Sequence, residues 1–181
     1  ALTTFNQNNE YEDTGSIVDW DNDFRIDGVY RPATAGKRYL VIGNYSNGAK
    51  TLHLEIYSSN KFRIYLGSGT VDQYSSTTIG KFNVELPYTF TWTASTHTYT
   101  FTAQSSSANT DVSMTGNYEQ ANGVATKTLR VGKTDYRNNG SSTFNATSYT
   151  KDLIMTKKYT YGENLNIPDP VTRVGYTFNT T

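Results

Sequence analysis

Cysteine is absent from the 181-residue chain, so no disulfide can hold the fold together and no thiol chemistry is available. There is also no run of about 20 apolar residues, so the sequence predicts no membrane insertion. The 16 basic and 16 acidic residues cancel, and a chain without net charge lacks the long-range field that attracts nucleic acid. We therefore expect neither a nucleic acid nor a lipid bilayer as a partner.

Glutamate is scarce, which bears on catalysis. Glycoside hydrolysis needs two carboxylates at a fixed separation, and the chain contains only six glutamates. Glu10 and Glu12 share one face of an alternating pattern, while a pairing of Glu55 with Glu85 or Glu119 is left open by the sequence. We therefore expect a protein that is not an enzyme, with a glycoside hydrolase as the weakest alternative.

Threonine and tyrosine are abundant, with 29 and 15 residues respectively. These residue types suit a pleated, half-buried surface. Apolar and polar residues alternate in short segments that recur about every 8–12 residues, with turn residues between them. The sequence predicts an all-β fold, a two-sheet antiparallel β-sandwich of the jelly-roll type that spans residues 1–160.

Two hairpins are predicted from this alternation. In the first, over residues 52–57 and 61–67, Leu, Ile and Phe occupy every second position and define a core side. In the second, over residues 88–93 and 98–103, Trp92 falls on the core side and threonines fall on the other. Successive side chains of a strand point to opposite sides. In the first hairpin, the residues between the Leu, Ile and Phe positions therefore form one polar face.

Three stretches carry a resemblance to a known family. Residues 11–15 lead into a strand at 23–30, a further strand ends at 42–44, and residues 129–132 precede a loop and a strand at 149–155. Their order resembles the concanavalin A-like family of lectin, laminin-G and glucanase domains. The resemblance implies a jelly roll that binds carbohydrate. Glucanases of that family carry a Glu-x-Asp-x-x-Glu strand, which this sequence lacks.

The last twenty residues carry a second resemblance. Tyr161-Gly162, the spaced Pro168 and Pro170, and Gly-Tyr-Thr-Phe at 175–178 resemble the opening of the Listeria–Bacteroides repeat of bacterial surface proteins. We expect residues 161–181 to be a truncated start of such a repeat or a linker. The resemblance implies a secreted or cell-surface location in a bacterium.

One stretch is a candidate metal site. Asp19, Asp21 and Asp23 alternate along the chain, and hard oxygen ligands at this density suit a structural calcium ion. An EF-hand is excluded because Phe24 and Tyr30 occupy its glycine and glutamate positions. The alternative, which we favour, is a solvated acidic turn that leads into a strand.

Carbohydrate recognition requires flat aromatic rings and planar polar side chains. The polar face of the first hairpin and the aromatic-bearing loops offer both, and loop aromatics are the stronger functional signal. The candidate ligand-binding residues are Trp20, His53, Glu55, Tyr57, Arg63, Tyr65, Tyr74, Tyr136 and Arg137. We expect a non-catalytic carbohydrate-binding, lectin-like module with a glycan or polysaccharide partner. The alternative is a structural spacer or an adhesin domain that binds a host or bacterial surface protein.

Overall fold

The computed structural model describes residues 3–5, 10–13, 18–32, 38–43, 52–57, 60–79, 83–104, 111–119, 125–126, 129–133 and 148–157. Within these ranges the chain forms β-strands and two single-turn 3-10 helices, η1 (Gly67–Gly69) and η2 (Ala94–Thr96). None of the helical segments in the described ranges is long and apolar enough to cross a membrane.

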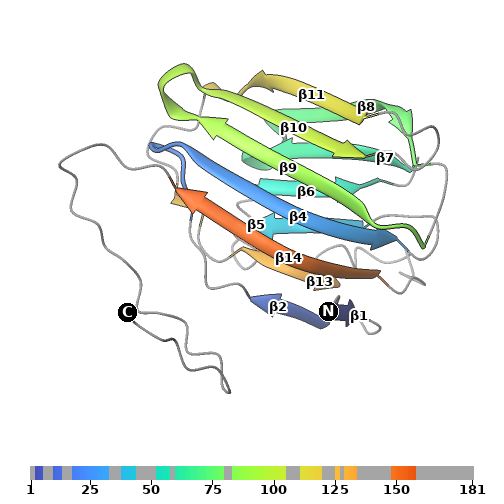
Figure 1. Cartoon of the computed structure of the whole chain (residues 1–181). Helices are drawn as coiled ribbons and strands as arrows, with labels where there is room; N and C mark the ends of the chain where they lie inside the picture. Colours follow the sequence, from blue (N-terminus) through green and yellow to red (C-terminus); the bar gives the residue numbers. More distant parts are fainter. Residues whose placement is uncertain are drawn as a thin grey trace, which may run out of the picture.

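The front sheet has six strands in the order β1-β14-β4-β9-β10-β11 (Figure 1). Every neighbouring pair in it is antiparallel. Its strands are β1 (Thr3–Phe5), β14 (Ser148–Lys157), β4 (Phe24–Pro32), β9 (Leu86–Thr93), β10 (Thr98–Gln104) and β11 (Asp111–Asn117).

The back sheet lies behind it in Figure 1 and also has six strands, in the order β2-β13-β5-β6-β7-β8. Its strands are β2 (Glu10–Asp13), β13 (Arg130–Lys133), β5 (Arg38–Gly43), β6 (Leu52–Ile56), β7 (Lys61–Leu66) and β8 (Val71–Thr78). A small two-stranded ribbon pairs β12 (Ala125–Thr126) with β3 (Val18–Asp19). The prediction of a two-sheet antiparallel β-sandwich is confirmed.

The core lies between the two sheets and is strongly aromatic. Phe90 and Trp92 of β9 are buried there, as are the apolar residues of the first hairpin, in agreement with the alternation of the sequence. The Trp92 indole Nε1 donates a hydrogen bond to the backbone oxygen of Trp20 at 2.7 Å. A buried indole N–H needs such an acceptor, so this bond fixes the segment that precedes β4 against the core.

Strand β8 is an element that the alternation did not predict. It pairs with β7 along the edge of the back sheet, although only Ser75 among its residues is fully buried. The strand turns Asp72 and Tyr74 toward the outer face of the sheet, beside the polar face of the first hairpin.

Candidate functional site

The outer face of the back sheet brings together most of the candidate residues. Arg63 of β7 lies directly opposite Glu55 of β6 and Tyr74 of β8. In the adjacent row Tyr65 of β7 lies opposite His53 and Asp72. We call this cluster the tyrosine face, and it consists of Tyr57, Arg63, Tyr65, Asp72 and Tyr74, with Glu55 as its buried member.

Two carboxylates fix the guanidinium at its centre. Arg63 Nη1 donates to Glu55 Oε1 at 2.9 Å, while its Nε and Nη2 donate to the two Asp72 oxygens at 2.6 and 2.8 Å. A bidentate pair of this kind is both strong and directional. The Glu55 side chain is 1% exposed, whereas that of Asp72 is 40% exposed. The side chain of Asp72 is therefore within reach of a ligand, whereas that of Glu55 is not.

The direction of the pKa shift of Arg63 agrees with this geometry. Burial by itself lowers the pKa of Arg63, but the hydrogen bond to Asp72 and the charge of Glu55 outweigh that effect and raise the pKa above its ordinary value. The guanidinium is therefore a permanent cation whose donors are directed at two carboxylates.

Three tyrosine rings surround this cation. The Arg63 Cζ lies 4.6 Å from the centroids of the Tyr57 and Tyr65 rings and 5.2 Å from that of Tyr74. The Tyr57 and Tyr74 rings also meet edge to face at 5.4 Å. Cation–π attraction of this kind holds the rings in place. Tyr74 is 39% exposed, which is unusual for a large apolar side chain among the described residues.

The structure corrects the expected exposure of His53 and the expected secondary structure of Tyr74. His53 is only 1% exposed, and its ring packs 5.5 Å from that of Tyr65, so it supports the tyrosine face rather than forming part of the surface. Tyr74 lies in a strand rather than in a loop. Asp72 was missed, although its alternation with Tyr74 is the signal that would have placed it on this face.

The sequence predicts that Trp20 binds ligand through an exposed ring, but the structure places this ring in the core. Its side chain is 1% exposed. The indole packs edge to face with Phe24, Trp92 and Tyr118 at centroid distances of 5.1, 4.9 and 5.1 Å. A ring enclosed in this way has no free face for a ligand. Tyr136 and Arg137 lie outside the described residues.

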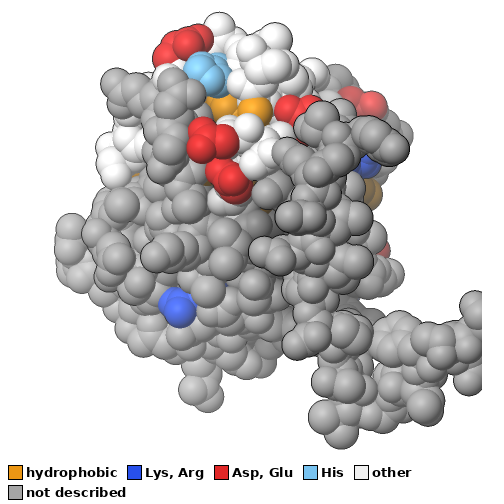
Figure 2. Space-filling model, turned by 90° about the vertical axis from the view of Figure 1, so that its left-hand side faces the viewer, with side chains coloured by type: hydrophobic (Ala, Val, Ile, Leu, Met, Phe, Trp, Pro, Cys, Tyr) orange, Lys and Arg blue, Asp and Glu red, His pale blue; other side chains and the backbone are white. Residues whose placement is uncertain are grey.

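The acidic turn at Asp19–Asp23 is held by hydrogen bonds. Asp19 accepts from the backbone N–H of Asp21 and from the Asn22 amide at 3.0 and 2.9 Å, and Asp23 accepts from the backbone N–H of Ala94 at 2.9 Å. Figure 2 shows this end of the sandwich, with acidic side chains around a histidine. In the part of the chain that the structure describes, no group of three His, Cys, Asp or Glu side chains is arranged to hold a metal ion.

Glu55 and Glu119, weighed above as possible catalytic partners, make separate contacts. Glu55 binds Arg63 on the tyrosine face. Glu119 lies at 3.2 Å from His97 Nδ1, at the end of strand β11.

No protein-family model matches the sequence, and no curated protein is significantly similar to it. Solved structures do share its arrangement of strands. The metal-free lectin I-B4 of Griffonia simplicifolia has a TM-score of 0.56 at 8% identity, over 87% of this chain and 88% of that one. Domains LG4-5 of the mouse laminin α1 chain have a TM-score of 0.54 at 14% identity, over 87% of this chain and 42% of that one.

An enzyme shares the fold as well. A family 7 alginate lyase, A1-II′ in complex with its substrate, has a TM-score of 0.52 at 10% identity, over 80% of this chain and 64% of that one. Identities this low establish the fold alone, a lectin-like jelly roll. Because this fold carries both binding and catalysis, the function has to be argued from the site. The resemblance of residues 161–181 to a surface-protein repeat falls outside the described residues and stays a prediction.

Proposed function

We propose that this chain is a non-catalytic carbohydrate-binding module that binds a glycan on its tyrosine face. The observation that carries the proposal is the fixed set of three tyrosine rings around Arg63, with Tyr74 well exposed. The apolar C–H side of a sugar ring packs on an aromatic face, and a flat ring held in place costs little entropy when it binds.

Asp72 supplies the polar half of this recognition. Its carboxylate is fixed by Arg63 and is still partly exposed, so it can accept hydrogen bonds from sugar hydroxyls. Because Arg63 directs its donors to Glu55 and Asp72, we assign it a positioning role: it holds the rings and the carboxylate rather than contacting the sugar. The lectin with this fold supports a glycan as the ligand class.

The module contributes weak binding that a larger protein amplifies by multivalency. We further propose that this protein is a bacterial secreted or cell-surface protein, on the strength of the repeat-like sequence at 161–181. A protein-binding adhesin or a spacer domain is the alternative outcome of the test below.

The test is a glycan array followed by affinity electrophoresis on the retained polysaccharides. Tyr74→Ala should weaken retention at least about tenfold, or about 1.4 kcal/mol, whereas Tyr74→Phe should keep most of it because the ring remains. Tyr57→Ala and Tyr65→Ala should act in the same direction. Val84→Ala is the matched control, because Val84 is a similarly exposed apolar side chain, at 41%, outside this face.

Two results would overturn the proposal. One is that no glycan retains the protein. The other is that a glycan retains all three tyrosine variants as strongly as the parent protein, while the variants melt at the same temperature as the parent. Release of reducing ends or unsaturated sugars from a retained glycan would instead establish catalysis.

A further inference from the structure

The outer face of the front sheet has a different chemistry from the tyrosine face. Strands β9, β10 and β11 turn small hydroxyl side chains outward in register, with Thr102 of β10 opposite Thr89 of β9 and Ser113 of β11. Gln104 and Asp111 form the last cross-strand pair of the β10–β11 ladder. Hydroxyl, amide and carboxylate groups therefore meet at one end of this face.

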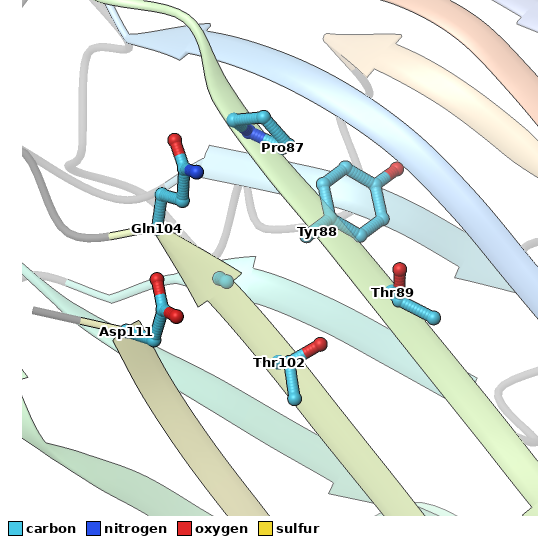
Figure 3. Close-up of a pocket in the computed structure, with 7 residues that line it drawn as sticks. Pro87, Tyr88, Thr89, Thr102, Gln104 and Asp111 are labelled. Atoms are coloured by element: carbon cyan, nitrogen blue, oxygen red, sulfur yellow. The ribbon is translucent and has the colours of Figure 1, made fainter.

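A hollow of about 220 Å³ lies at that end, over β9, β10 and the start of β11 (Figure 3). It exists because the short threonine side chains leave space that the longer Gln104, Asp111 and Pro87 enclose. Tyr88 contributes to the floor while its ring points into the core, where it is 3% exposed. The hollow is smaller than the roughly 300–1,000 Å³ of pockets for drug-sized ligands, and its size suits a single sugar ring.

The polar groups around the hollow are available for a ligand. Thr102, Gln104 and Asp111 are exposed, and they make no side-chain hydrogen bond or ion pair with the other described residues. The Thr89 hydroxyl donates to Asp27 Oδ1 at 2.7 Å, so it presents its lone pairs outward. Together these groups supply an amide donor, a hydroxyl and several acceptors.

The charge of the lining restricts the ligand further. Asp111 is the one charged residue among the described residues that line the hollow. Its carboxylate disfavours anionic ligands and can accept two hydrogen bonds from a vicinal diol. The one aromatic residue in the described lining, Tyr88, is only 3% exposed, so recognition there depends on hydrogen bonds rather than on stacking.

We infer that this hollow is a second carbohydrate site, which binds one uncharged sugar unit through a vicinal diol held by Asp111 and Gln104. It lies on the opposite sheet from the tyrosine face and does not depend on it. A module with sites on both outer faces can bridge two glycan chains or two parts of one chain, which raises avidity without any new contact at either site.

The experiment titrates the ¹⁵N-labelled full chain with methyl glycosides of glucose, galactose, mannose, fucose and N-acetylglucosamine, and with methyl glucuronide. The side-chain amide signals of Gln104 are identified by their loss in Gln104→Leu. At least one neutral glycoside should shift these signals with a millimolar dissociation constant, and methyl glucuronide should bind at least about tenfold more weakly.

Variants separate the hollow from the tyrosine face. Asp111→Asn should weaken the binding reported by the Gln104 signals by about tenfold or more, and Tyr74→Ala should leave the shifts of these signals unchanged. Ser113→Ala is the matched control, an exposed hydroxyl on β11 outside the lining. The inference is overturned if no neutral glycoside shifts the Gln104 signals, or if Asp111→Asn binds as the parent does. Neither result affects the proposal for the tyrosine face.

Discussion

Trp20 lies at the centre of the aromatic cluster that closes one end of the core. Its ring contacts Phe24, Trp92 and Tyr118, and its backbone oxygen accepts the Trp92 indole hydrogen bond. It therefore contributes to stability through packing and through the position it gives to its own backbone.

We predict that Trp20→Ala lowers the free energy of unfolding by about 3–5 kcal/mol, because it leaves a large cavity in a closely packed core. Urea denaturation followed by tryptophan fluorescence or circular dichroism measures this. Tyr74→Ala, at an exposed position, should cost less than about 1 kcal/mol in the same assay. Equal costs for the two variants would contradict the assignment of Trp20 to the core.

At the scale of the element, one buried hydroxyl bridges β7 and β8 where their ladder is irregular. The Phe62 backbone N–H donates to Ser75 Oγ at 3.0 Å, and Ser75 Oγ donates to the backbone oxygen of Thr77 at 2.7 Å. The register between the two strands shifts between Lys61 and Arg63, so the ladder is irregular at this point. The hydroxyl replaces a ladder bond that the bulge has removed.

We predict that Ser75→Ala costs about 1–3 kcal/mol, because it leaves the buried Phe62 N–H without an acceptor. Hydrogen exchange should also speed up selectively at the amides of β8. Ser76→Ala is the matched control, since Ser76 is the exposed neighbour, and it should change neither quantity. A Ser75→Ala protein with unchanged exchange in β8 would show that the strand is held by other contacts.

The same strand shows which elements the sequence predicts. The hairpin over residues 52–66 was predictable because its apolar residues alternate with the period of a strand. Strand β8 was not, because an edge strand need bury few side chains, and its buried residue is a serine. The candidate site follows the same rule. Alternation in the hairpin places Arg63, Tyr57 and Tyr65 on one face, whereas Asp72 and its alternation with Tyr74 belong to β8, the strand that was not predicted.

At the scale of the whole molecule, tyrosine serves two purposes. Some phenols form the exposed tyrosine face, and others fill the space between the sheets. Tyr88 is the extreme case: its ring packs so closely over Gly28 that a Cβ at position 28 would lie 2.4 Å from its hydroxyl. Its buried hydroxyl has no hydrogen-bond partner among the residues that the structure describes. Burial strongly raises the pKa of Tyr88, and the nearby Tyr30 and Asp27 raise it further.

Buried phenols make the folded state sensitive to alkali. Burial also raises the pKa values of Tyr99 and Tyr118 above their ordinary value. A phenol whose pKa is raised by folding stays neutral in the native state while the unfolded chain ionises near pH 10. Its contribution to stability is therefore complete below about pH 10 and is lost as the pH rises further.

We predict that the free energy of unfolding falls steeply above about pH 10, with Tyr88 alone adding about 1.4 kcal/mol per pH unit to the slope. Tyr88→Phe should reduce that slope. It should not destabilise the protein at neutral pH, because the hydroxyl that it removes makes no hydrogen bond within the described part of the chain. Urea denaturation at several alkaline pH values measures the slope. Phenolate absorbance should rise in two stages, with the buried tyrosines ionising only on unfolding.

Tyr65→Phe serves as the control, because it removes a phenol hydroxyl on the outer face. A slope that Tyr88→Phe leaves unchanged would mean that alkaline unfolding is governed by other groups.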